Sequence, residues 1–173
     1  MIVDTIRVFD KIAFKLPSEM VYDMEALMLD PLTKDLYVIS KRLQNERVFR
    51  IAYPQLLEKV NIAELICQLP YGYEGFEGSG VTGGDISADG QEILIRTYAK
   101  VYYYKRNRDE SIKDALGKKP KRVRYEMEPQ GEGICWHPEL KGYYTISELS
   151  QFEVPPHLYF YEREKDKGKK KNK

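Results

Sequence analysis

A short pattern that occurs three times constrains the fold of this chain more than any other feature. Each copy has a first segment that contains an acidic residue, then a turn, then a second segment rich in β-branched and aromatic residues. The first segments span residues 23–27, 83–87 and 130–134, and the second segments span residues 36–41, 92–98 and 143–148. Self-similarity of this kind is the mark of an architecture built from repeated supersecondary units.

The rest of the sequence favours strands. Alternating apolar and aromatic runs bounded by Pro, Asp and Gly turns are typical of sheets. They predict strands at residues 4–14, 21–29, 36–41, 47–53, 61–68, 84–88, 92–98, 101–105, 122–127, 133–136, 143–147 and 158–161. One helix is expected, over residues 109–116, because acids occupy its first turn and Gly117 can end it.

The spacing of the repeat predicts a β-propeller. The recurring acids Glu25, Asp85 and Glu132 are separated by intervals close to the ~40 to 50 residues of a four-stranded blade, the first lengthened by a glycine-rich loop. We therefore expect an all-β chain with about three blades over residues 1–163 and a disordered basic tail over 164–173. Because three blades cannot close a ring, the chain would be half of a six-bladed propeller, completed either by a missing N-terminal half or by dimerisation. The strand at residues 4–14 would finish the last blade.

Composition excludes several classes of protein. Apolar residues make up 42% and charged residues 32%, with a formal net charge of +1, which fits neither a disordered chain nor a membrane-spanning one. The first residues include Asp4 and lack the pattern of an export signal, so the chain as written predicts a cytoplasmic setting. Two cysteines and two histidines are too few for a disulfide framework, a zinc site or the usual histidine-based catalysis.

The order of the repeated motifs resembles that of a family of uncharacterised bacterial β-propeller proteins. The likeness covers residues 1 to about 163 and rests on the strings 23–41, 81–87 with 95–98, and 128–134 with 144–148. It implies a propeller that is distantly similar to gluconolactonase-like and phytase-like propellers. It also implies an N-terminal half with Trp-Glu-Asp-Ile-Ala and Gly-Asp-Ile-Gly-Asp-Asn type motifs, both absent from this chain, and an extracytoplasmic setting for the relatives.

The recurring acids are candidate metal ligands. The first strand of each blade lines the central channel, so equivalent positions fall on one ring, and Glu25, Asp85 and Glu132 would converge there. Oxygen-only ligation suits calcium or magnesium. The alternative is structural, with each acid pairing with a basic side chain or accepting backbone N–H bonds. Four further charged residues recur near the acids and are candidate ligand-binding residues: Asp23, Lys41, Arg96 and Glu148.

Three other features have simpler explanations. The glycines at 83 and 84 have no Gly-Lys-Ser/Thr sequence after them, so they indicate a crowded inner strand and not a phosphate loop. Cys135 is expected to be a small buried residue. Residues 105–124 hold nine basic and three acidic residues, and residues 162–173 hold seven and three. Such runs indicate either an anionic partner or solvated loops, and nucleic acid is not expected because no aromatics interleave with the lysines.

Three hypotheses of function follow. In the first, the protein is a ligand-binding or interaction module whose acidic channel binds a divalent cation or a small cationic or sugar-like molecule. In the second, it is a metal-dependent hydrolase of the lactonase or phosphoester type, whose cation is held by the three acids and activates water. The third is a half-propeller whose exposed blade faces pair with another copy. No membrane association is expected.

Overall fold

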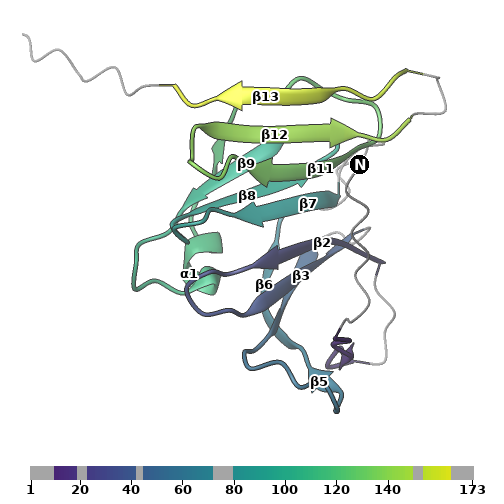
Figure 1. Ribbon diagram of the computed structural model, residues 1–173, viewed down its shortest axis with the longest axis vertical. Coiled ribbons are helices and arrows are strands. Elements are labelled where there is room, and N and C mark those ends of the chain that lie inside the picture. The colour runs from purple at the N-terminus through teal and green to yellow at the C-terminus, as the bar shows by residue number, and fades with distance from the viewer. Residues whose placement is uncertain (1–9, 19–22, 42–44, 72–79, 150–153, 165–173) are drawn as a thin grey trace, which may run out of the picture.

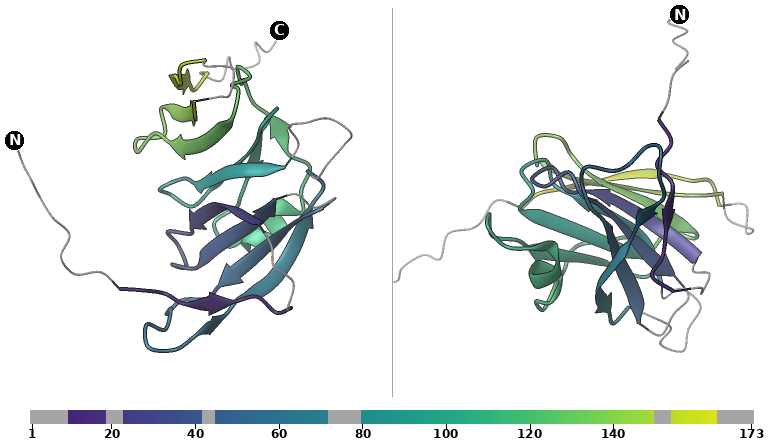
Figure 2. Two further views of the ribbon diagram at one scale, coloured as in Figure 1. Left: turned by 90° about the vertical axis from the view of Figure 1, so that its right-hand side faces the viewer. Right: turned by 90° about the horizontal axis from the view of Figure 1, so that it is seen from below.

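The fold is all-β, with three antiparallel sheets stacked one above another (Figure 1). The computed structural model describes residues 10–18, 23–41, 45–71, 80–149 and 154–164. Figure 2 shows the stack from the side, with the sheets following one another in chain order. In these residues no helix is long and apolar enough to cross a membrane.

The first sheet is an antiparallel meander in the order β2-β3-β4-β6. Its strands are β2 (Asp23–Leu29), β3 (Leu36–Lys41), β4 (Glu46–Ile51) and β6 (Glu64–Leu69). The turn between β2 and β3 is built by Asp30, whose carboxylate accepts bonds from the Leu32 N–H and the Thr33 hydroxyl, both 3.0 Å long. A short polar side chain that bonds the backbone two residues on is a standard turn former, so the predicted turn is confirmed.

The second sheet has the order β10-β9-β8-β7 and carries the helix. It consists of β7 (Val81–Ile86), β8 (Glu92–Thr97), β9 (Val101–Lys105) and β10 (Lys121–Arg122). The helix α1 (Ile112–Leu116) lies between β9 and β10 and ends at Gly117 as expected, but it begins three residues later than predicted because Ser111 is its N-cap. The strand predicted at residues 122–127 is wrong beyond its start, because Tyr125 and Glu128 turn inward to contact Arg96.

The third sheet has three strands among the described residues, β11 (Gly131–Trp136), β12 (Gly142–Ser147) and β13 (Leu158–Glu162). A separate parallel pair joins β1 (Phe14–Lys15) to β5 (Asn61–Ile62). The strand predicted at residues 4–14 lies outside the described residues up to position 9. Its described end pairs with β5 and not with the third sheet, because the Asn61 amide and backbone both bond the Ala13 carbonyl.

The first strands of the three sheets, β2, β7 and β11, are neighbours (Figure 1). Two adjacent glycines allow this close approach. A Cβ atom on Gly83 would come within 2.6 Å of the Glu132 carbonyl oxygen in β11, and one on Gly84 within 2.8 Å of the Met28 sulfur in β2. Real Cβ atoms do not approach other atoms so closely, so larger residues would push the sheets apart. The expectation of a crowded inner strand is confirmed.

The two junctions between the sheets differ in chemistry. Between the first and second sheets lies a mainly aliphatic core, to which Ala26, Met28, Ile39, Ile93 and Ile95 contribute. A buried ion pair between Asp30 and Arg106 also joins these two sheets. Between the second and third sheets the core is smaller and rich in tyrosine, and it contains a buried charge, the guanidinium of Arg96, with no exposed area.

Both outer faces of the stack expose apolar side chains, although the segments that follow β1 and β5 cover part of the first sheet's outer face. On the first sheet, Leu27 and Leu29 are 65% and 54% exposed. On the third sheet, Leu158 is 68% exposed and Cys135 is also exposed. The prediction that Cys135 is buried is therefore wrong: its cross-strand neighbour is Tyr144, on the face that has no sheet packed against it.

Candidate functional site

The candidate site is a cluster of Glu25, Lys41, Tyr98 and Glu132, which we call the polar cluster. The Lys41 ammonium donates a hydrogen bond of 2.8 Å to the Tyr98 hydroxyl and lies 3.3 Å from a Glu25 carboxylate oxygen. The Tyr98 hydroxyl in turn donates a bond of 2.8 Å to Glu132. A single chain of interactions thus links residues from all three sheets.

Sheet geometry explains why these residues meet. Each first strand has a register irregularity against its second strand, between residues 24 and 26, 81 and 83, and 131 and 133. The extra residue at each of these bulges is Glu25, Thr82 and Glu132. A bulge breaks the pairing and redirects the side chain that it carries. Because the three bulges occupy equivalent places, the two glutamates come to the same end of the stack.

The other two members of the cluster, Lys41 and Tyr98, lie at the ends of the second strands of their sheets. Lys41 is the last residue of β3, and Tyr98 and Glu148 directly follow β8 and β12. The three are therefore equivalent positions in successive sheets. Lys41 and Tyr98 contact one another, with the ammonium 4.7 Å from the ring centroid, in the range of a cation–π interaction. Glu148 is exposed, and its charge raises the pKa of Glu132.

Burial and charge act in opposite directions in the polar cluster. Burial raises the pKa of Glu132 above its usual value, although the Tyr98 hydrogen bond and the Lys41 charge oppose the shift. Burial alone would lower the pKa of Lys41, but its bond with Tyr98 and the charges of Glu132 and Glu25 outweigh this and raise it. The cluster therefore holds a charged ammonium among carboxylates, one of which is less acidic than usual.

Asp85 does not belong to this cluster. The structural repeat places Thr82, not Asp85, in the position of Glu25 and Glu132, so the assumed equivalence of the three acids is wrong by three residues. Asp85 accepts backbone N–H bonds of 2.9 Å from Ile86 and 2.7 Å from Trp136. It ties β7 to β11, and burial raises its pKa in spite of these bonds.

The metal prediction finds no support in this arrangement. No group of three or more His, Cys, Asp or Glu side chains that could hold a metal ion occurs in the described part of the chain. The Lys41 ammonium contacts Glu25 and shares the Tyr98 hydroxyl with Glu132, so a positive charge already serves both carboxylates. Calcium or magnesium ligation by Glu25, Asp85 and Glu132 stays a prediction.

The other predicted ligand-binding residues fall in different environments. Asp23 is exposed at the start of β2, opposite Lys41. Arg96 is fully buried. Its guanidinium donates hydrogen bonds to the carbonyls of Gly133 and Ile146, at 2.6 and 3.1 Å, and to the hydroxyl of Tyr125 at 2.8 Å. Arg96 therefore stabilises the junction between the second and third sheets.

One member of the site, Tyr98, and one residue at an equivalent bulge, Thr82, were not selected from the sequence. Tyr98 was treated as a strand residue, although its place after the second strand matches that of Lys41 and Glu148. Thr82 occupies the second bulge, and its hydroxyl donates a 2.9 Å bond to the Gly131 carbonyl of the next sheet. Aligning the units on the ends of their second strands would have found both residues.

Comparison with known proteins adds no family: no family model matches this chain, and no curated protein is significantly similar to it. The resemblance to bacterial propellers therefore stays a prediction.

Proposed function

We propose that this protein is a ligand-binding module whose polar cluster recognises a small polyhydroxylated, sugar-like molecule. The observation that carries the proposal is the chain of contacts from Glu25 through Lys41 and Tyr98 to Glu132, which joins all three sheets. The side chain of Glu25 is 27% exposed, so solvent reaches the cluster.

The chemistry of the cluster favours hydroxyl groups over a divalent cation. Carboxylates accept several hydrogen bonds and an ammonium donates three, so the cluster offers both acceptors and donors. A ligand hydroxyl group can donate a hydrogen bond to a carboxylate and accept one from the ammonium at the same time. A divalent cation would need Glu25 and Glu132 as ligands and would be repelled by the Lys41 ammonium beside them. This is also the reason to prefer binding over the metal-dependent hydrolase.

Thermal unfolding in the presence of candidate ligands tests the proposal. The panel comprises neutral sugars, a small polyamine and calcium chloride. Ligand at about 100 times its Kd adds roughly 2.7 kcal/mol to the free energy of unfolding. We expect at least one sugar to raise the Tm of the natural protein and to lose this effect in Glu132→Gln and Lys41→Met.

Glu139→Gln is the matched control, since Glu139 is an exposed glutamate that pairs with Lys141 in the turn after β11. It should keep the full sugar effect. No shift with any sugar, or equal shifts in Glu132→Gln and in the control, would reject the proposed site. A shift with calcium alone, together with calcium-dependent lactone or phosphoester hydrolysis, would instead favour the hydrolase.

We further propose that the three sheets are blades of a β-propeller that a second copy completes. The second sheet packs one face on the first sheet and the other face on the third. At the ends of the stack the outer faces expose apolar side chains, Ile146 and Leu158 on the third sheet and Leu27 and Leu29 on the part of the first sheet that the segments after β1 and β5 do not cover. Two copies offer these faces in matching pairs, and such head-to-tail contacts close a ring when the rotation allows it.

The mass in solution tests ring completion. We expect twice the chain mass of 20.3 kDa, and a monomer for Leu27→Asp combined with Leu158→Asp, because a charge in an apolar interface is costly. Lys59→Asp, an exposed change in the loop before β5, should leave the dimer intact. A folded monomer of the natural chain would reject the second copy as the partner and leave a missing N-terminal half as the alternative.

A further inference from the structure

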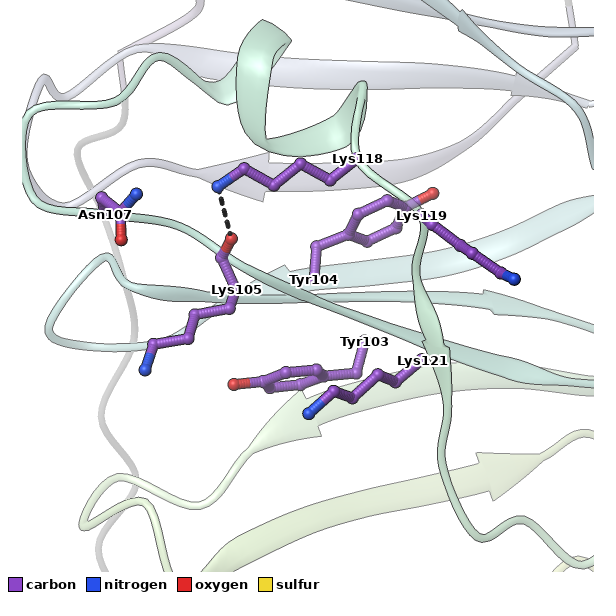
Figure 3. A pocket seen from close by; sticks show the side chains of 7 residues that line it. All are labelled: Tyr103, Tyr104, Lys105, Asn107, Lys118, Lys119 and Lys121. Carbon is purple, nitrogen blue, oxygen red and sulfur yellow. Dashed lines mark hydrogen bonds between the residues drawn. The ribbon is translucent and has the colours of Figure 1, made fainter.

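A second site lies on the far edge of the second sheet, where the chain leaves β9, forms α1 and returns as β10. A cavity of about 180 Å³ opens there (Figure 3). It is lined by two tyrosines, one asparagine and four lysines, namely Tyr103, Tyr104, Asn107, Lys105, Lys118, Lys119 and Lys121. Nothing in the proposed function involves these residues.

The edge pairing of the sheet brings the lysines together. Lys121 in β10 is the cross-strand partner of Tyr103 in β9, and Lys105 lies two residues further along β9, so these three side chains share one face of the sheet. Lys118 follows the helix, and its side chain reaches β9, where the ammonium donates a hydrogen bond of 3.3 Å to the Lys105 carbonyl. Four cationic side chains thus surround one small cavity.

The charge of this cavity is poorly balanced within the protein. Lys118 pairs with Glu110, whereas Lys105, Lys119 and Lys121 make no ion pair with the described residues. Glu92, the cross-strand partner of Lys105, accepts a bond from the Tyr103 hydroxyl and is already paired with Arg163. An excess of positive charge in a concave site attracts an anion.

We propose that this cavity binds a phosphate group. Sites for whole drug-sized ligands usually measure ~300–1,000 Å³, so 180 Å³ admits one small group and not a large organic molecule. Lysine ammonium groups bind phosphate as point charges, and Asn107 lines the same cavity with a side-chain amide that can donate hydrogen bonds. The phosphate can be free, part of a soluble phosphomonoester, or the headgroup of a lipid.

The side chain of Lys119 provides an internal control (Figure 3). The ammonium groups of Lys105, Lys118 and Lys121 lie toward one side of the cavity, whereas that of Lys119 points the opposite way. Lys105→Gln, Lys121→Gln and Lys119→Gln each remove one positive charge from the same region. Only the first two remove a charge from the side where the phosphate is expected.

Titration of the natural protein with inorganic phosphate, at ionic strength held constant with sodium chloride, tests the proposal by calorimetry or by NMR shifts of the Lys105–Asn107 backbone. We expect saturable binding. An exposed ion pair contributes ~0.2–1 kcal/mol, so Lys105→Gln and Lys121→Gln should each weaken binding about 1.4- to 5-fold, and Lys119→Gln should leave it unchanged.

Three results would overturn the proposal: no saturable binding, equal weakening by all three substitutions, or equal binding of chloride. Glycerol phosphate and vesicles containing phosphatidic acid, compared with phosphatidylcholine vesicles, identify the source of the group. Binding of inorganic or glycerol phosphate alone indicates a soluble ligand, and additional vesicle binding that Lys121→Gln weakens indicates a lipid headgroup. Sugar binding at the polar cluster is measured separately, so failure of either site leaves the other standing.

Discussion

Asp85 and Glu132 look alike in the sequence and have opposite roles in the structure. Both are acids in the first strand of a repeat unit, and burial raises the pKa of both. The two carboxylate oxygens of Asp85 accept hydrogen bonds from the backbone N–H groups of Ile86 and Trp136. Glu132 bonds a hydroxyl on the side chain of Tyr98 and stands beside the Lys41 ammonium. The partner therefore distinguishes a carboxylate bonded only to backbone N–H groups from one that contacts side chains and that we propose to bind a ligand.

Arg96 extends this comparison, because its charge is fully buried between the second and third sheets. Its guanidinium lies 3.3 Å from Glu128 in a junction where both side chains are almost completely buried. Gly131 makes room for it, since a Cβ atom there would come within 1.7 Å of the guanidinium. Substitutions at Arg96, Asp85 and Glu132 should therefore have decreasing effects on stability.

The largest loss is expected for Arg96→Met. Removing one partner of a buried ion pair typically costs ~3–5 kcal/mol, because it leaves an uncompensated charge. The free energy of unfolding, from urea titration, should fall by that amount. Arg124→Met is the control, since Arg124 and its partner Glu126 are 81% and 63% exposed, and it should change stability by less than about 1 kcal/mol. Equal losses would contradict the structural role of Arg96.

Asp85→Ala should have an intermediate effect. It leaves the buried N–H groups of Ile86 and Trp136 without their acceptor, which costs roughly 1–3 kcal/mol. Urea unfolding at pH 7 measures the loss, and sugar binding at the polar cluster should persist in the folded fraction. Loss of binding with unchanged stability would place Asp85 in the site and remove the distinction from Glu132.

Glu132→Gln should have the smallest effect on stability and the largest on binding. Gln keeps an acceptor for the Tyr98 hydroxyl, so the free energy of unfolding at pH 7 should change by less than about 1 kcal/mol. Tm and urea titration check stability, and the ligand panel described above checks binding. A loss as large as that of Arg96→Met would show that Glu132 is a structural residue.

The pH dependence of stability sharpens the same comparison. The folded protein raises the pKa of Glu132 above its ordinary 4.5. As the pH falls, the Glu132 carboxylate therefore takes up a proton in the folded state before it does so in the unfolded state. Its contribution to the free energy of unfolding is fully present below pH 4.5 and is lost as the pH rises through the raised pKa. Glu132→Gln should remove this contribution, so its stability should fall less than that of the natural protein between pH 4 and pH 6. An identical pH dependence of the two proteins would contradict the raised pKa.

Much of the fold could be predicted from local patterns. Residues 36–41 and 101–105 form strands with the predicted bounds, and the helix ends at Gly117 as predicted, although it begins at Ile112 and not at residue 109. These features depend on neighbours in the chain: alternation of side chains in strands, and Ser111 and Gly117 at the ends of α1. The short β10 was mispredicted, because the path of residues 123–128 depends on contacts with Arg96, far away in sequence.

The candidate site could be predicted only in part. Glu25, Lys41 and Glu132 were selected from their recurrence in the repeat, and the structure brings them together. Asp85 was misplaced because the alignment followed residue type, whereas the bulges put Thr82 in the equivalent position. A bulge adds one residue to one strand without changing the sequence pattern much, so the register of the first strands was not visible in the sequence.

By itself, the sequence determined that the chain forms sheets from repeated units, because turn residues and side-chain alternation act over a few positions. Only the tertiary structure decided which charged groups meet. The pairing of Lys41 with Glu25 and Tyr98, the burial of Arg96 and the gathering of lysines around one cavity all depend on how strands are registered and sheets are stacked. Electrostatic interactions weaken steeply with distance and solvent exposure, so the role of each charge followed from its position in space.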